Sequence, residues 1–161
     1  MAGSAIAGAD WTALPREHVQ AWPGAWDPIG GQQPVAAVER RVLIVEDEAL
    51  VALTLEAMVE DMGHVVAGIA ANPREALRLA HDAGPEVILM DVRLGRKGDE
   101  GIVTAAAIAA GSSASIIFVT AYGDQATMSR IEAAVPGAQV LAKPVNVSEL
   151  AKAIEHAFRQ P

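Results

Sequence analysis

The sequence contains no cysteine, and this absence excludes disulfide bonds, cysteine-ligated zinc, iron–sulfur clusters and cysteine nucleophiles. Positive charge is also scarce, because 12 Lys and Arg face 20 Asp and Glu and leave a formal net charge of -8. That balance disfavours broad contact with nucleic-acid phosphates, so we expect no direct nucleic-acid binding. The chain lacks an 18-residue apolar run and a signal-peptide-like start, so we expect no membrane contact and a cytoplasmic location.

Aromatic residues are rare as well, at 4% of 161 residues, although hydrophobic residues make up 52%. A core must therefore consist mainly of Ala, Val, Leu and Ile, which suits helices packed on a buried parallel sheet. The length corresponds to one domain with an appendage. Residues 1–39 contain all three tryptophans and a single cation, Arg16, without a sustained apolar period. We expect an N-terminal extension over 1–39, partly disordered, and a domain over 40–161.

Short apolar runs alternate with amphipathic stretches from residue 40 onward. The runs are four to six residues long, rich in Val and Ile, and cover 42–45, 64–69, 87–90, 115–120 and 139–142. Runs that are apolar on both faces are typical of buried parallel strands, and the stretches between them have the length of helical crossovers. The pattern predicts an α/β fold, a three-layer, doubly wound, five-stranded parallel sheet with five helices.

Helix boundaries in the sequence support this division. Asn72 and Asn146 stand where helix N-caps are expected, followed three residues later by Glu75 and Glu149. Gly63 is placed to end a first helix over 49–62.

Polar residues follow four of the five predicted strands. They are Glu46 and Asp47 after the first, Asp91 after the third, Thr120 at the end of the fourth and Lys143 after the fifth. Any single one of them is explained equally well by the chain entering solvent at that point. Ligands of open parallel sheets bind beyond the carboxyl ends of the strands, so the set as a whole predicts a site.

The residue types point to phosphoryl transfer onto a carboxylate. Converging carboxylates repel one another, so Glu46, Asp47 and Asp91 predict a bound divalent ion, for which we expect Mg2+. Asp91 is the candidate nucleophile, while Lys143 and Thr120 would stabilise the phosphoryl oxygens. Pro144 restricts Lys143 to extended geometry and is a candidate for a cis peptide bond.

These residues lie in motifs that resemble the receiver domain of response regulators in two-component signalling. The motifs are Arg41-Val-Leu-Ile-Val-Glu-Asp-Glu, Ile88-Leu-Met-Asp-Val, Phe118-Val-Thr-Ala and Leu141-Ala-Lys-Pro, and the resemblance covers about residues 40–160. It implies the flavodoxin-like strand order 2-1-3-4-5. It also implies that a histidine kinase or a His-containing phosphotransfer protein phosphorylates Asp91.

The resemblance further assigns the ligands of the metal and of the phosphoryl group. It implies that Asp47 binds Mg2+ directly, that Glu46 acts largely through water, and that the backbone carbonyl of Arg93 is the third protein ligand. Thr120 and Lys143 would bind the phosphoryl group.

The sequence departs from the family pattern at its switch residues. The place of the usual switch aromatic, three residues before the lysine, holds Val140. The only Tyr, Tyr122, is a candidate replacement, because Phe118-Val-Thr-Ala-Tyr-Gly is similar to a variant motif of stand-alone receivers; alternatively it only covers the mouth of the site. In the family, Arg93 and Tyr122 occupy positions that flank the hydrolytic water, and their bulk predicts slow loss of the phosphoryl group.

The segment after Asp91 also departs from the family, because its acidic-Gly pair comes about two residues late. With Gly95, Gly98 and Gly101, we expect a longer and more mobile loop over 94–101.

The predicted function is a phosphorylation-dependent switch or phosphorelay intermediate that catalyses only its own phosphorylation and dephosphorylation. Its output would be a downstream protein, which the sequence does not name, or a homodimer. Either the face of 123–134 and 139–159 or the first helix would serve for docking. Two alternatives stay open: a phosphohydrolase of the haloacid-dehalogenase type, disfavoured because its nucleophilic Asp lies on the first strand, and a receiver cut from a longer regulator.

Overall fold

The computed structural model describes residues 38–158 apart from 96–97 and 122. The predicted extension over 1–39 lies almost wholly outside the described residues, as does Tyr122, and both assignments stay predictions. The five strands are β1 (Arg41–Val45), β2 (Val65–Ala70), β3 (Val87–Asp91), β4 (Ser115–Thr120) and β5 (Gln139–Ala142). The helices are α1 (Ala49–Asp61), α2 (Pro73–Asp82), α3 (Glu100–Ala109), α4 (Gln125–Ala134) and α5 (Val147–Ala157).

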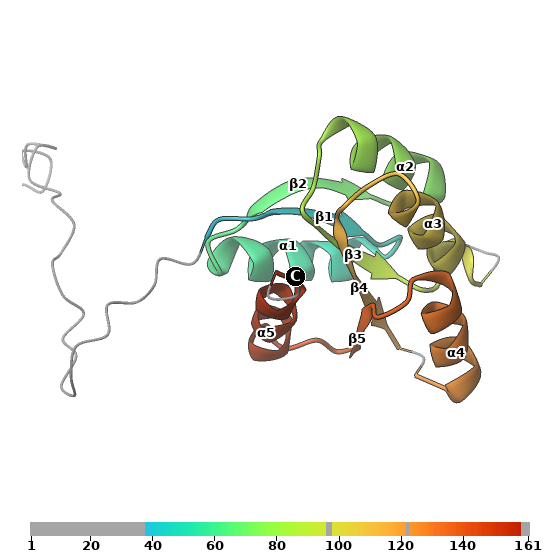
Figure 1. The fold of residues 1–161 in the computed structure, drawn as a ribbon. Helices are drawn as coiled ribbons and strands as arrows, with labels where there is room; N and C mark the ends of the chain where they lie inside the picture. The colour runs from blue at the N-terminus through green and yellow to red at the C-terminus, as the bar shows by residue number, and fades with distance from the viewer. Residues whose placement is uncertain (1–37, 96–97, 122, 159–161) are drawn as a thin grey trace, which may run out of the picture. The chain divides into compact units, whose positions relative to one another are not determined.

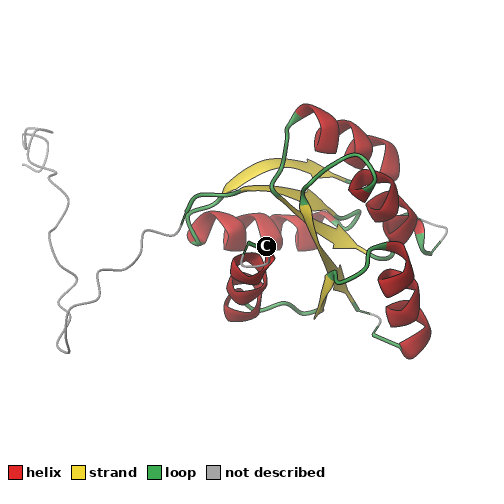
Figure 2. Cartoon of the chain, viewed as in Figure 1, coloured by secondary structure: helices red, strands yellow, loops and turns green. Residues whose placement is uncertain are grey.

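The strands form one parallel sheet in the order β2-β1-β3-β4-β5, which confirms the predicted strand order. Helices α1 and α5 cover one face of the sheet, and α2, α3 and α4 cover the other (Figure 1). Helices and strands alternate along the chain, so each parallel pair is joined by a helical crossover (Figure 2). Because all strands run the same way, their carboxyl ends meet at one edge.

Each face of the sheet has its own apolar core. Leu43, Ile88 and Phe118 lie in the cluster beneath α2, α3 and α4. Residues that alternate with them along the strands, such as Ile44 and Leu89, pack against α1 and α5. The period of two along a strand places neighbouring side chains on opposite faces, which is why the central strands are apolar throughout.

The two edge strands differ from the expectation of full burial. Most residues of β2 and β5 are only half-buried, whereas β3 is buried along its whole length. An edge strand has only one neighbouring strand and lies partly beyond the covering helices, and this explains its exposure. In the sequence its apolar run looks like that of a central strand, so the pattern alone does not distinguish the two.

The predicted helix boundaries agree with the structure to within a residue or two. The side chain of Asn72 accepts a hydrogen bond from the backbone N–H of Glu75 at 3.0 Å, and Asn146 caps α5 in the same way. The carboxylate of Glu75 accepts from the N–H of Ala71 rather than from the cap residue. Gly63 follows α1 with φ +79°, a conformation that glycine adopts without strain.

Among the described residues, no helix combines the length and the apolar character that a bilayer crossing requires.

Candidate functional site

The predicted site residues lie at the carboxyl edge of the sheet. Glu46 and Asp47 directly follow β1, Asp91 is the last residue of β3, and Thr120 is the last of β4. Lys143 directly follows β5. The order of the strands brings residues far apart in the sequence to neighbouring positions, because β1 and β3 are hydrogen-bonded neighbours.

Three carboxylates form a cluster at this edge. One oxygen each from Glu46, Asp47 and Asp91 lies within 4.8 Å of the others. Glu46 and Asp91 are buried, with 3% and 6% of their surface exposed, whereas Asp47 is exposed. The backbone N–H of Gly95 donates to Oδ2 of Asp47 at 3.2 Å and holds this carboxylate from the loop that follows β3.

Lys143 joins two of these carboxylates. Its Nζ lies 2.6 Å from Oε2 of Glu46 and 3.3 Å from Oδ2 of Asp91. Burial alone would lower the pKa of Lys143, but the hydrogen bond with Glu46 and the charge of Asp91 outweigh it, so the pKa is raised. Lys143 therefore carries its positive charge at neutral pH.

The pKa of Glu46 is raised by burial, and the negative charge of Asp91 raises it further against the opposing effect of Lys143. Burial is the largest cause of this shift, and the hydrogen bond and charge of Lys143 do not offset it. The cluster is an incompletely neutralised site that additional positive charge would stabilise.

The remaining predicted residues have different positions. Thr120 is buried, with 1% exposed, and its carbonyl accepts a hydrogen bond from the N–H of Lys143 at 2.9 Å. The Lys143–Pro144 peptide bond is cis. Val140 lies half-buried on β5, and the Arg93 side chain is exposed two residues beyond Asp91. The metal contact of the Arg93 carbonyl and the switch roles of Val140 and Tyr122 stay predictions.

The segment after Asp91 corrects one expectation. Gly101 is not a loop residue: α3 begins at Glu100, and Gly101 is buried in its first turn. Sequence reasoning also missed an ion pair between Asp99, at the start of α3, and Arg130 on α4. The available signal for Gly101 was its place directly before the apolar stretch that begins at Ile102, since a glycine inside a helix is disfavoured unless backbones come close.

The donor set of the cluster fits a hard divalent cation. Mg2+ prefers carboxylate oxygens and is commonly held by one or two carboxylates together with water and phosphate oxygens. Two carboxylates next to a half-buried ammonium at the end of a parallel strand also form an environment for a phosphoryl group.

Comparison with known proteins identifies the family. Residues 42–155 match the response regulator receiver domain. The chain belongs to the receiver family of response regulators. The receiver is 40% identical over 123 residues to the transcriptional regulatory protein PdtaR of Mycobacterium tuberculosis, covering 76% of this chain and 58% of that protein. It is 33% identical over 130 residues to the phyllosphere-induced regulator PhyR of Methylorubrum extorquens, covering 80% and 47%. It thus spans about half of these relatives.

Solved structures agree with this assignment. The signal receiver domain of a modulated diguanylate cyclase from Desulfovibrio desulfuricans is 41% identical, with a TM-score of 0.68 over 74% of this chain and 94% of that one. The response regulator PhyR from Brucella abortus is 31% identical, with a TM-score of 0.62 over 75% and 48%. The comparisons give the haloacid-dehalogenase alternative no support.

Proposed function

We propose that this receiver is a cytoplasmic, phosphorylation-dependent signalling switch or phosphorelay intermediate whose phosphoacceptor is Asp91. The observation that carries the proposal is the meeting of Asp91 with Glu46, Asp47 and Lys143 at one edge of the sheet. Asp91 ends the buried strand β3, so its carboxylate is held at the site by the core beneath it. This fixed geometry favours in-line attack on a phosphorus atom.

Each residue has a role in the proposed transfer. A carboxylate oxygen of Asp91 forms a bond to the phosphorus of a phosphohistidine while the P–N bond breaks, and the electron pair of that bond returns to the imidazole. Mg2+ held by Asp47, Asp91 and the Arg93 carbonyl, with Glu46 acting through water, would neutralise the phosphoryl oxygens. The ammonium of Lys143 and the hydroxyl of Thr120 bind the transferred group.

The output of the switch is proposed to be protein interaction rather than catalysis of an external reaction. The PhyR of Bartonella quintana, 30% identical over 75% of this chain, is described as an anti-anti-sigma factor. This receiver would report phosphorylation by a change in what it binds, as a homodimer or with a downstream protein.

The phosphodonor would be a histidine kinase or a His-containing phosphotransfer protein, and its docking site is proposed to be the groove beside α1. The groove has a volume of about 450 Å3, and its lining includes Leu50, Met58 and Lys143. Leu50 is 74% exposed, so α1 presents apolar surface directly beside a residue of the acceptor site. A donor helix on this surface would bring its phosphohistidine to Asp91.

The decisive experiment is incubation with acetyl phosphate and Mg2+. The wild-type protein should gain one phosphoryl group per chain, as measured by intact mass, and Asp91→Asn should gain none. The adduct should require Mg2+ and should not form when EDTA is present from the start. An unmodified wild-type protein, or an adduct that persists in Asp91→Asn, would contradict the proposal.

A second experiment separates the docking groove from the acceptor site. Leu50→Asp should slow phosphotransfer from a histidine kinase at least tenfold and leave the rate with acetyl phosphate unchanged. Leu77→Asp is the matched control, because Leu77 is an exposed leucine on α2, on the other face of the sheet. Equal effects of the two variants on the kinase reaction would remove the groove from the proposal.

A further inference from the structure

The first turn of α3 lies in unusually close contact with the backbone of Asp91. A Cβ added to Gly101 would overlap the carbonyl oxygen of Asp91 and would lie 2.8 Å from that of Val92. Among the described glycines, the other close approaches are at Gly68 and Gly95, and both are to flexible side chains. Backbone cannot yield as a side chain does, so the residue at 101 is limited to glycine by its contact with the candidate phosphoacceptor.

The contact is fixed by the packing around it. The N–H of Gly101 donates to the carbonyl of Val92 at 3.2 Å. Ile102 and Ala105, on the same helix, are buried in one apolar cluster with Met90, the residue before Asp91. The start of α3 and the end of β3 are therefore one closely packed unit, and a shift of either displaces the other.

An ion pair connects the start of α3 to α4. Asp99 occupies the N-cap position of α3, but its side chain makes no capping hydrogen bond and forms an ion pair with Arg130 of α4 instead. The two side chains are 39% and 51% exposed, and a pair so accessible to water contributes little to stability. Its consequence is geometric, because it joins α4 to the residue two positions before Gly101.

We propose that Gly101 is a positioning residue for Asp91, and that Arg130, acting through Asp99, makes this position depend on α4. The inference rests on the proposed function, since it concerns how readily Asp91 accepts a phosphoryl group. The connection runs along α3 and needs neither Thr120 nor an aromatic at the place of Val140. By linkage, a partner that shifts α4 would change the reactivity of Asp91, and phosphorylation would in turn bias α4.

The test compares Arg130→Met, Arg130→Lys and Asp99→Asn with the control Arg78→Met. Arg78 is also exposed and pairs with Asp82 at 3.5 Å, but within α2. The rate of phosphorylation by acetyl phosphate should change about three- to tenfold in Arg130→Met, with the Mg2+ affinity and the melting temperature as in the control. Arg130→Lys should restore most of the wild-type rate, because the charge is kept.

Two further readouts distinguish positioning from a general loss of structure. The double variant of Asp99→Asn and Arg130→Met should match either single variant, because both remove one contact. In the unphosphorylated protein, hydrogen exchange at the Gly101 amide, resolved by NMR, should be faster in Arg130→Met than in Arg78→Met.

The outcomes separate this inference from the proposed function. A wild-type protein that takes up no phosphoryl group overturns the proposed function and the positioning role together. Normal phosphorylation of the wild type, with Arg130→Met unchanged in rate and in Gly101 exchange, overturns the positioning role alone.

Discussion

Strands β1 and β3 have charged residues at both ends, and the two ends differ in how those charges are neutralised. At the amino edge of the sheet, Arg40 precedes β1 and Glu86 precedes β3; at the carboxyl edge, Glu46 follows β1 and Asp91 ends β3. Arg40 pairs with Glu86 at 2.7 Å, which balances one charge with one charge. The carboxyl edge instead has three clustered carboxylates and Lys143.

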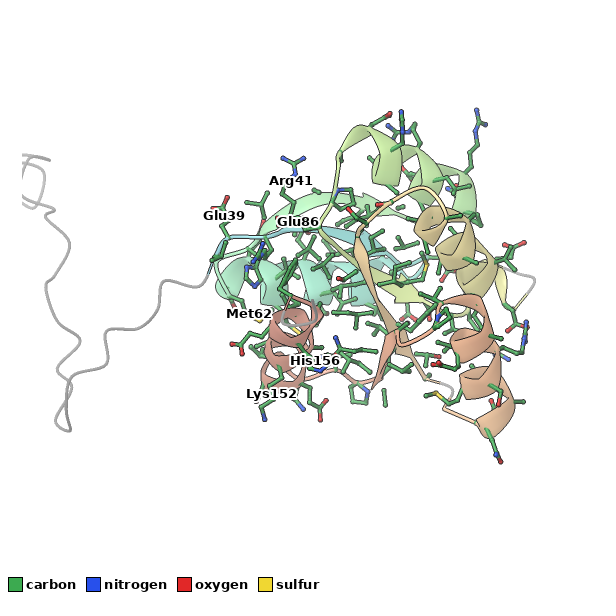
Figure 3. All side chains as sticks on the ribbon, in the orientation of Figure 1. Glu39, Arg41, Met62, Glu86, Lys152 and His156 are labelled. Atoms are coloured by element: carbon green, nitrogen blue, oxygen red, sulfur yellow. The ribbon has the colours of Figure 1, made fainter. Side chains whose placement is uncertain are left out.

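The pKa shifts follow this difference. Hydrogen bonds from the Arg40 side chain and the Arg41 backbone lower the pKa of Glu86, so its ionised form is favoured in the folded protein. Arg41 and Glu86 are both labelled at this edge in Figure 3. The Arg40 guanidinium also lies 3.8 Å from the centroid of the Phe158 ring. At the other edge, the pKa of Glu46 is raised. At the amino edge the charged groups pair with each other, whereas the clustered carboxylates at the carboxyl edge favour the binding of a cation.

The largest expected effect comes from removing the lysine that pairs with two carboxylates of the cluster. Lys143→Met removes the ammonium that the buried carboxylates of Glu46 and Asp91 share, and we expect it to lower the free energy of unfolding by about 2–3 kcal/mol in the absence of Mg2+. Mg2+ should recover part of the loss, because it supplies the missing charge. Urea unfolding with and without Mg2+ measures both effects.

The matched control is Lys152→Met, since Lys152 is an exposed lysine on α5 (Figure 3). It should change the free energy of unfolding by less than about 0.5 kcal/mol. If Lys143→Met behaved like this control, or if Mg2+ restored none of the lost free energy of unfolding, the charges at the carboxyl edge would be as well neutralised as those at the amino edge.

The next largest effect concerns the backbone that holds the carboxyl edge. Gly101→Ala forces a Cβ against the Asp91 carbonyl, and we expect a loss of about 1–3 kcal/mol in the free energy of unfolding. Gly111→Ala is the control, because Gly111 has open space around its Cβ position and no positive φ. Equal thermal stabilities of the two variants would show that the start of α3 adapts to a side chain.

Most of the fold follows from local patterns in the sequence. Apolar runs and caps such as Asn72 and Asn146 depend on neighbours within a few residues, and they gave the strands and helices nearly to the residue. The candidate site could also be predicted from the sequence. The carboxyl ends of parallel strands meet at one edge of a sheet, so Asp91 and Lys143 were expected to lie close together.

Side-chain contacts between separate helices and strands were not predicted, because no repeating pattern in the sequence encodes them. The pairing of Asp99 with Arg130 depends on how α3 and α4 sit against each other, and an acidic residue before a helix suggests capping instead. The fixed place of Gly101 was also missed, because a cluster of glycines favours a mobile loop unless close backbone packing is known. The ion pair of Arg40 with Glu86 links residues 46 positions apart.

A smaller effect is expected at the amino edge. In a double-mutant cycle, Arg40→Met and Glu86→Gln should show a coupling of about 0.5–1 kcal/mol at neutral pH, with or without Mg2+. Because the folded pKa of Glu86 lies below its ordinary value of 4.5, the coupling should be present above that value and be lost as the pH falls through the lower, folded pKa. A coupling that depends on Mg2+ would contradict the separation of the two edges.

The smallest expected effect is a pH dependence at the amino edge. Burial and the positive charge of Arg40 lower the pKa of His64 below 6.5, and its Nδ1 is buried without a hydrogen-bond partner. The unfolded chain therefore binds a proton at a higher pH than the folded protein, so stability contributed by neutral His64 is present above 6.5 and is lost as the pH falls through 6.5 towards the lower, folded pKa. In urea unfolding, His64→Asn should reduce the pH-dependent loss in the free energy of unfolding by less than about 1 kcal/mol. The control His156→Asn, at an exposed histidine on α5, should retain the whole loss. Because the effect belongs to the amino edge, the difference between the two variants should be the same in Mg2+ and in EDTA; a slope that both variants share equally would assign the pH dependence to other groups.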